Sequence, residues 1–294
     1  MTRVAVIGLG TMGLPMARRL VDAGHEVVGC DVDLARLEQL GASAAATPAA
    51  AADGAEAVLL SLPTPAVVED VVLGADGVRE GAAGGTLLAD MSTSPPALAR
   101  RLASECAELD VLDAPVSGGP RGAEDASLTI MVGGEEVSFQ RALPLFEALG
   151  RLVVLVGPHG AGQTAKLCNN LIAGATMAAI AESCAIATRG GIDPRVLYGL
   201  VSASTGDSRV LRTRFPLTGA DDSHPSSQGF APLFALDLIA KDMELALELA
   251  EAQGVDATVA RAALAAYRDA QHEGRGALDY SAVYLRFDPG EAGE

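Results

Sequence analysis

The sequence predicts an α/β protein in two parts: a doubly wound, mostly parallel sheet, followed by an all-helical domain that a long helix joins to it. From residue 3 to about residue 155, short β-branched and aliphatic runs alternate with helical patterns, which is typical of strand–helix repeats. After about residue 163 no strand pattern returns, and long helical stretches follow. A chain of 294 residues is long enough for two such domains.

The expected strands are short. Those near the N-terminus are almost wholly apolar, as in strands that helices cover on both faces. We predict strands at residues 3–7, 26–29, 57–61, 86–90, 111–112, 127–132 and 152–156. Helices are expected at residues 163–188, 194–201, 233–253 and 256–273, with a polar loop at 219–228. The predicted division is a sheet domain over residues 1–162, an interdomain helix over 163–190 and an all-helical C-terminal domain over 191–294.

The composition indicates a compact protein with an acidic surface. Hydrophobic residues make up 49% of the chain and charged residues 20%, which is typical of a folded protein. The formal net charge of −17 repels phosphate backbones and anionic lipid surfaces, so neither nucleic acid nor a membrane is an expected partner. A small anionic substrate would need local hydrogen-bond donors to reverse this repulsion.

The four cysteines lie far apart and show no C-x-x-C spacing, so we expect neither a zinc site nor a disulfide framework. The apolar run at residues 4–7 is followed at once by Gly8, Gly10 and Gly13, and this argues against a signal peptide. The longest apolar stretch elsewhere, residues 171–181, is too short to span a bilayer. The expected location is a reducing cytoplasm.

A glycine-rich turn follows the first strand directly and opens a helix that Gly24 closes. In this context the first glycine permits a tight turn, the second admits the pyrophosphate of a dinucleotide to the backbone, and the third lets the helix pack closely on the strand. The pattern predicts a Rossmann-type dinucleotide site at Gly8, Leu9, Gly10, Thr11, Met12 and Gly13.

Asp31 ends the second expected strand, 18 residues after Gly13. An acidic side chain at this point accepts hydrogen bonds from the ribose hydroxyls of NAD and repels the 2′-phosphate of NADP. Val32 and Asp33 offer no cation, and Arg36 lies several residues further on. The predicted cofactor is NAD, with NADP less favoured.

Only two of the 21 cationic residues are lysines, Lys166 and Lys241. A lysine, unlike arginine, is a compact ammonium that can release its proton, so the two exceptions call for a reason. Lys166 and Asn170 are spaced i, i+4 on the expected long helix, and both therefore project from one face. Apolar side chains around the site and the cationic ring of oxidised nicotinamide would both lower the pKa of Lys166 and so favour its neutral amine. Lys166 is thus a candidate general acid or base at a substrate oxygen during hydride transfer.

Six segments occur in an order that makes the chain similar to a known family: GLGTMGLPMA (8–17), LPT (62–64), DMST (90–93), DAPVSGG (113–119), GPHGAGQTAKLCNN (157–170) and KD (241–242). The chain resembles the β-hydroxyacid dehydrogenases, which include 3-hydroxyisobutyrate dehydrogenases and tartronate semialdehyde reductases. The resemblance also implies a C-terminal domain like that of 6-phosphogluconate dehydrogenase.

The resemblance implies a set of site residues. The substrate carboxylate would be bound by Ser117, Gly118 and Gly119, with Lys166 catalytic and Asn170 orienting the substrate. The glycines suit this role because they leave the backbone free to turn N–H groups toward an anion, beside the serine hydroxyl. The cofactor would also contact Leu62, Pro63, Thr93 and Lys241.

The resulting hypothesis is a cytoplasmic, NAD-dependent enzyme without a metal that interconverts a small 3-hydroxy acid and its semialdehyde. The helical part carries more apolar positions than a short bundle buries, so a homo-oligomer, dimer or tetramer, is expected. One alternative is an imine reductase-like NAD(P)H enzyme, which normally has another proton donor in place of Lys166. The other is a non-catalytic dinucleotide-sensing protein, which would be expected to lose Lys166 or the Ser-Gly-Gly turn. Cys168, two residues after Lys166, is expected as a buried thiol.

Overall fold

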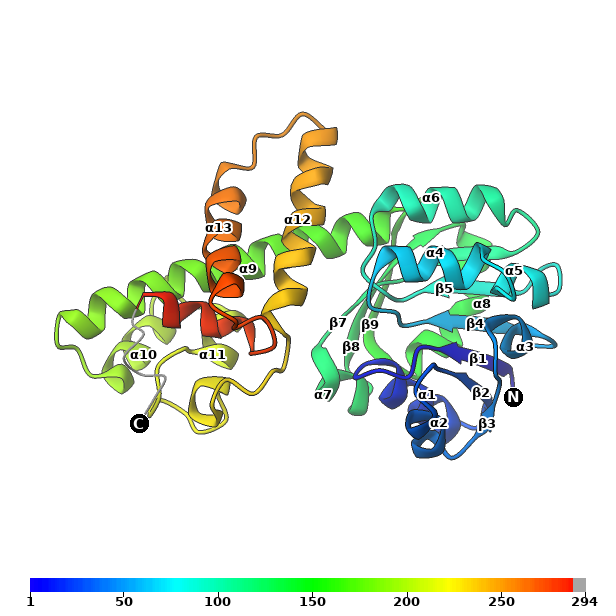
Figure 1. Ribbon diagram of the computed structural model, residues 1–294, viewed down its shortest axis with the longest axis horizontal. Coiled ribbons are helices and arrows are strands. Elements are labelled where there is room, and N and C mark those ends of the chain that lie inside the picture. Colours follow the sequence, from blue (N-terminus) through cyan, green and yellow to red (C-terminus); the bar gives the residue numbers. More distant parts are fainter. Residues whose placement is uncertain (288–294) are drawn as a thin grey trace. The chain divides into compact units, whose positions relative to one another are not determined.

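The computed structural model describes residues 1–287, and the chain folds into two compact units (Figure 1). Unit 1 comprises Met1–Lys166 and unit 2 comprises Leu167–Glu294. The long helix α9 (Ala161–Arg189) begins in unit 1 and continues in unit 2. The doubly wound sheet with a following all-helical region confirms the predicted fold class, while the three-part domain division stays a prediction.

Unit 1 is built on one nine-stranded sheet in the order β3-β2-β1-β4-β5-β6-β8-β7, with β9 also paired to β8. The first six strands in this order are parallel, and β8 runs antiparallel to both β6 and β7. The order 3-2-1-4-5-6 is that of the Rossmann fold. The strands are β1 (Arg3–Ile7), β2 (Glu26–Cys30), β3 (Ser43–Ala44), β4 (Ala57–Leu60), β5 (Leu87–Asp90), β6 (Asp110–Asp113), β7 (Val116–Ser117), β8 (Leu128–Gly134) and β9 (Gly150–Gly157).

Helices cover both faces of this sheet, which is why its strands are apolar on both sides. In β1, Val4 and Val6 enter a core that includes side chains of α1 and α8, whereas Ala5 and Ile7 enter a second core with α4 and α6. The unit 1 helices are α1 (Gly13–Asp22), α2 (Leu34–Leu40), α3 (Pro48–Ala52), α4 (Pro65–Leu73), α5 (Val78–Gly81), α6 (Pro96–Glu105), α7 (Gly119–Glu124) and α8 (Glu136–Glu147).

Among the described residues of unit 2 the regular elements are helices, and the unit has a core of its own. Buried side chains of α9, including Met177 and Ala181, pack with α12, α13 and the 3-10 helix η2. Its elements after α9 are α10 (Pro194–Ser202), α11 (Arg209–Arg214), the 3-10 helix η1 (Pro225–Gln228), α12 (Leu236–Ala252), α13 (Thr258–His272) and η2 (Tyr280–Arg286).

Several short elements differ from the sequence expectation. The strands β3 and β7 have two residues each, too few for an alternating pattern to stand out. The helix α11 has six residues, and η1 forms the end of the expected 219–228 loop.

By length and composition, the long helix α9 could also cross a membrane. A core helix passes the same test, and Met177 and Ala181 are fully buried in the core of unit 2.

Candidate active site

The three glycines of the turn between β1 and α1 meet three different surroundings. Gly8 has φ +88°, and a Cβ there would lie 2.3 Å from the Ser61 carbonyl oxygen. A Cβ on Gly13 would lie 1.8 Å from the Gly8 carbonyl oxygen, so only glycine lets α1 approach the strand this closely. A Cβ on Gly10 would meet nothing within 4 Å, and no side chain caps the start of α1. The turn therefore offers open backbone and uncapped N–H groups, which suit a pyrophosphate.

Asp31 is bound to this turn. Its Oδ2 accepts a hydrogen bond from the Leu9 N–H at 2.6 Å, and its Oδ1 accepts one from the Asp33 N–H at 2.8 Å. The Gly8 N–H donates to the Cys30 carbonyl at 2.8 Å, which joins the ends of the two strands. Each carboxylate oxygen keeps a further lone pair, so Asp31 can still accept from ribose hydroxyls.

A cation from α2 contacts the same turn, although the sequence offered no reason to expect one there. Arg36, on α2, donates from Nη1 to the Leu9 carbonyl at 3.1 Å, while its Nε lies 3.4 Å from Asp33 Oδ2. Leu9 is thus held through its N–H by Asp31 and through its carbonyl by Arg36. This contact could not be predicted from the sequence, because 27 residues separate Leu9 from Arg36. A cavity of about 370 Å³ borders the turn, and its lining includes Gly10, Thr11, Arg18, Arg19 and Arg36.

The loops that follow β4 and β5 are joined to each other. The Leu62 N–H donates to Ser92 Oγ at 2.9 Å. Pro63 is exposed, whereas Leu62 and Thr93 are half-buried. These are the ends of neighbouring parallel strands, the edge at which open α/β sheets bind ligands. Leu62, Pro63 and Thr93 therefore share an edge of the sheet with the glycine turn.

The turn Ser117-Gly118-Gly119 leaves β7 and enters α7. Gly118 has φ +145° and Gly119 has φ +66°, conformations that residues with a Cβ rarely adopt. Two such residues in sequence redirect the chain, and Ser117 and Gly119 stay half-buried beside the exposed Gly118. Arg121, just beyond, is 90% exposed and pairs with Asp125. The N–H groups and the Ser117 hydroxyl of the turn are therefore better placed than the Arg121 side chain to receive a small anion.

Lys166 stands at the end of unit 1, on the second turn of α9, and is only 8% exposed. The start of this helix is fixed by Asp113, at the end of β6. Its Oδ1 accepts the Gly160 N–H at 2.7 Å and its Oδ2 accepts the Gln163 N–H at 2.9 Å. A carboxylate at this position satisfies N–H groups that a helix start leaves without an internal partner.

Two buried carboxyl groups lie near the start of α9. Asp90 accepts the Ser92 N–H and the Ser94 hydroxyl, each at 3.0 Å. Burial raises the pKa of Asp90 to about 6, although its hydrogen bonds to the two serines oppose the shift. Burial also raises the pKa of Asp113, against the hydrogen bonds from Gly160 and Gln163. The sequence alone suggested no role for either aspartate.

Asn170 and Lys241 converge on one carboxylate in unit 2. Asp242 Oδ2 accepts a hydrogen bond from Asn170 Nδ2 at 2.6 Å, and its Oδ1 lies 2.9 Å from Lys241 Nζ. Asp242 is 2% exposed and Asn170 5%. The Asn169 amide donates to Asn170 Oδ1 at 2.9 Å, so both ends of the Asn170 amide are oriented. Asp242 joins two candidate site residues, and this contact could not be predicted because 72 residues separate Asp242 from Asn170.

The expectation that Cys168 is a buried thiol is wrong. Cys168 is exposed, not buried, because it lies on the outer face of α9, whereas the other three cysteines are buried. Within residues 1–287, no three His, Cys, Asp or Glu side chains gather as a metal-binding group. A larger cavity, of about 500 Å³, lies between α12 and α13, and none of the predicted site residues lines it.

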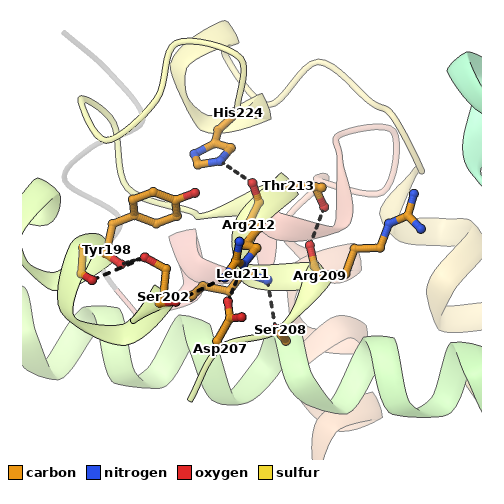
Figure 2. Close-up of polar contacts among 10 residues, drawn as sticks. Tyr198, Ser202, Asp207, Ser208, Arg209, Leu211, Arg212, Thr213 and His224 are labelled. Carbon is orange, nitrogen blue, oxygen red and sulfur yellow. Dashed lines mark hydrogen bonds and ion pairs between the residues drawn. The ribbon is translucent and has the colours of Figure 1, made fainter. Parts of the chain in front are cut away.

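The arginines of α11 are engaged in unit 2. Figure 2 shows Ser208 capping α11 through the Leu211 N–H, and the buried imidazole of His224 against the Arg212 carbonyl. The Arg212 guanidinium pairs with Asp207 at 2.7 Å. Arg214 pairs with the buried Asp279 at 3.4 Å. These contacts give the arginines a structural role in holding α11 and the following loop.

Comparison with known proteins gives two family matches that together cover most of the chain. Residues 3–157 match the profile for the NAD binding domain of 6-phosphogluconate dehydrogenase. Residues 160–287 match the profile described as NAD-binding of NADP-dependent 3-hydroxyisobutyrate dehydrogenase.

Individual relatives agree with these matches over almost their full length. A 3-hydroxyisobutyrate dehydrogenase of Pseudomonas aeruginosa is 42% identical, covering 96% of this chain and 97% of that protein. An NAD-dependent L-serine dehydrogenase of the same organism is 38% identical over 98% of this chain and 99% of its own. A structure of Mycobacterium tuberculosis 3-hydroxyisobutyrate dehydrogenase with L-serine superimposes with a TM-score of 0.90 at 33% identity, over 98% of this chain and 99% of that one.

A Rossmann-type sheet, an open glycine turn and a helical second unit define a dehydrogenase that uses a nicotinamide dinucleotide. The chain belongs to the β-hydroxyacid dehydrogenase family, as its sequence motifs predicted.

Proposed function

We propose that this protein is an NAD-dependent oxidoreductase that interconverts a small 3-hydroxy acid and its semialdehyde, with Lys166 as the general acid and base. The observation that carries the proposal is Lys166 itself. It is one of only two lysines in the chain, and it is 8% exposed on a helix whose start a buried carboxylate fixes. Burying a lysine costs free energy, and lysine, unlike the arginine that this protein uses elsewhere, can release its proton.

The residues present fit a dinucleotide. Gly10 leaves open space where a Cβ would lie, and Asp31 keeps acceptor capacity beside it. The pyrophosphate would be held by the turn at residues 8–13, and the ribose by Asp31. Leu62, Pro63, Thr93 and Lys241 would contact the rest of the cofactor. When bound, the nicotinamide supplies a hydride acceptor or donor.

The roles of the other residues follow from their chemistry. The hydroxyl of Ser117 and the N–H groups of Gly118 and Gly119 would bind the substrate carboxylate. Asn170, whose amide is oriented by Asp242, would hold the substrate hydroxyl or carboxylate. Lys166 takes the hydroxyl proton in oxidation and returns it to the carbonyl oxygen in reduction.

Lys166→Ala tests the mechanism directly. We expect kcat to fall by roughly 10² to 10⁴, the usual range for one general acid or base, while NAD still binds. Lys166→Arg should restore little, because guanidinium does not exchange its proton near neutral pH. The measurement is reduced-nicotinamide absorbance with 3-hydroxy acids that include 3-hydroxyisobutyrate and L-serine. A variant that keeps more than about a tenth of wild-type turnover contradicts the role of Lys166.

The carboxylate requirement is tested with a matched acid and alcohol. Without the carboxylate the donors of the Ser117 turn lose their partner, so the alcohol should be worse by roughly 10³ or more in kcat/KM. Ser117→Ala should weaken use of the acid and barely change use of the alcohol. Equal activity on both compounds would make the turn structural and move an imine or simple alcohol substrate ahead of the hydroxy acid.

The preference for NAD is tested at Asp31 and Arg36. We expect NAD to give the higher kcat/KM because the Asp31 carboxylate repels a 2′-phosphate. Asp31→Asn should narrow the preference, since the Arg36 guanidinium, from α2, already contacts the same turn and can then face the phosphate. Asp31→Asn combined with Arg36→Ala should lose that gain for NADP. A wild-type enzyme that uses NADP better than NAD contradicts the assignment of Asp31.

We also propose a cytoplasmic homo-oligomer. Unit 2 leaves large apolar side chains on the outer face of α9, among them Ile172 at 64% and Ile186 at 73% exposure. Such a face favours burial against another copy. Light scattering after size-exclusion chromatography gives the mass in solution, and a mass near the 29.8 kDa of one chain would exclude an oligomer.

A further inference from the structure

A fully buried glutamine in the first turn of α9 has no role in the mechanism above. Gln163 is 0% exposed and stands three residues before Lys166, so the two residues lie about one helical turn apart. Its side chain reaches the loop between β5 and α6, residues 91–95, although 69 residues separate Gln163 from Ser94. The residues next to Gln163 in the sequence give no indication of this contact.

Both ends of the Gln163 amide hold this loop. Its Oε1 accepts the Ser94 N–H at 2.9 Å, and its Nε2 donates to the Ser92 carbonyl at 2.9 Å. These two residues flank Thr93, so a single side chain grips the backbone immediately before and after it. An apolar side chain of the same size would fill the space but leave two buried backbone groups without partners. A group with one donor and one acceptor, such as this amide, satisfies both.

The two hydrogen bonds of the Gln163 amide belong to a wider buried network. Ser92 Oγ accepts the Leu62 N–H at 2.9 Å, and Asp90 accepts the Ser92 N–H at 3.0 Å. The backbone N–H of Gln163 donates to Asp113 at 2.9 Å. Hydrogen bonds therefore run from the loop after β4, through the loop after β5, into the start of α9. Buried polar networks of this kind, once satisfied, hold one arrangement of the backbone.

We propose that Gln163 is a positioning residue that sets where Thr93 and Lys166 stand relative to each other. The inference rests on the proposed function, in which Thr93 contacts the cofactor and Lys166 meets the reacting oxygen. Hydride transfer with the cofactor and proton transfer with Lys166 act on one substrate, so both groups must be placed correctly, and a displacement of about 1 Å can lower the rate 10²-fold. Gln163, on the helix that carries Lys166, makes two hydrogen bonds to the loop that carries Thr93.

The first test replaces the amide by an apolar chain of similar length, Gln163→Met. We expect kcat to fall by roughly 10- to 100-fold and the dissociation constant for NADH, followed by its fluorescence, to rise several-fold. Thr164→Val is the matched control, because the Thr164 hydroxyl donates to the Gly160 carbonyl, and it should leave both quantities unchanged. Circular dichroism and thermal unfolding confirm that each variant is folded at the assay temperature.

The second test observes Lys166 without turnover. Because the chain has two lysines, ¹³C-lysine labelling gives only two Cε resonances, and Lys241→Arg assigns them. In the protein without cofactor, Gln163→Met should shift or broaden the Lys166 resonance and leave that of Lys241 in place. Thr164→Val should move neither. An unchanged Lys166 resonance together with unchanged NADH affinity overturns the proposal, whatever happens to kcat.

The third test keeps the shape of the amide and changes its charge. In Gln163→Glu, the protonated acid retains both hydrogen bonds, whereas the ionised form presents an acceptor to the Ser92 carbonyl. Asp113 accepts the Gln163 N–H, and Asp90 accepts from Ser92 and Ser94, whose backbone groups Gln163 holds. Burial and the charges of these two aspartates raise the pKa of a new carboxyl at this position, and the Lys166 ammonium, one turn further along α9, opposes the shift without removing the effect of burial. The kcat of Gln163→Glu divided by that of wild type should therefore fall as the pH rises. A ratio independent of pH overturns the proposal, and this variant replaces Gln163→Met if the latter does not fold.

These outcomes separate the inference from the function on which it rests. If Lys166→Ala keeps its turnover, the proposed mechanism fails, yet NADH affinity and the Lys166 resonance still report on Gln163. If Lys166→Ala is inactive and Gln163→Met turns over at the wild-type rate, the mechanism stands and the positioning role falls.

Discussion

Each unit buries carboxylates, but the two units surround them differently. In unit 2, Asp279 is 0% exposed and pairs with Arg214, while four N–H and O–H groups of Leu233, Phe234 and Ser281 also donate to it. In unit 1, Asp90 and Asp113 are held by N–H and O–H donors of neutral residues, and burial raises the pKa of both. A carboxylate with a cation acts as a structural clasp. One held by neutral donors can change its protonation near the loops that carry the candidate site.

The largest effect is expected where the clasp is broken. Asp279→Ala leaves Arg214, whose side chain is 17% exposed, without its buried counterion, and it also removes the acceptor of four donors, of which the two on Ser281 are buried. We expect the free energy of unfolding to fall by about 3–5 kcal/mol. Urea denaturation at pH 7 measures this value. A loss below about 1 kcal/mol would mean that the clasp contributes no more than a surface pair.

A second prediction concerns Asp90 and follows from the direction of its pKa shift. The folded-state pKa of about 6 exceeds the ordinary value of 3.8. The stabilisation from the neutral acid is therefore complete below about pH 3.8 and is lost as the pH rises through about 6. Asn cannot ionise, so Asp90→Asn should gain on wild type by roughly 3 kcal/mol between pH 4 and pH 7.

The measurement for Asp90 is urea unfolding of both proteins at several pH values in that range. Glu147→Gln removes an exposed carboxylate of unit 1 and should run parallel to wild type throughout. A difference between Asp90→Asn and wild type that does not change with pH would show that Asp90 titrates like an exposed acid, and the contrast with Asp279 would disappear.

The smallest effect is expected at an exposed pair. Arg212 and Asp207 lie 2.7 Å apart, but the arginine side chain is 58% exposed. Solvent screens such a pair, so Arg212→Ala should change the free energy of unfolding by less than about 1 kcal/mol. Comparison with Asp279→Ala in the same denaturation assay isolates the effect of burial. Losses of equal size would show that burial does not separate the two pairs.

The sequence allowed prediction of features that depend on neighbours along the chain. The positions of Gly8, Gly10 and Gly13 follow from one turn between a strand and a helix, and the structure gives each glycine the surroundings that the pattern requires. The apolar strands and the long helix also followed from local periodicity. The two-residue strands and α11 were missed because they are too short for a period to appear.

Contacts between distant segments could not be predicted in this way. Arg36 reaches Leu9 across 27 residues, Gln163 reaches Ser94 across 69, and Asp242 reaches Asn170 across 72. Each polar side chain looks unremarkable in its own segment, where a solvated face or a helix cap explains it equally well. Only the packing of the strands and helices decides which partner it meets.

The exposure of Cys168 makes the protein easy to label at one place. All four cysteines lie in the described part of the chain, and the other three are buried. A maleimide fluorophore should therefore attach at Cys168 in a dissociated chain, two residues from Lys166 on the same helix. Cys168 also stands four residues before Ile172, on the outer face of α9, so association through that face should slow the labelling as the protein concentration rises.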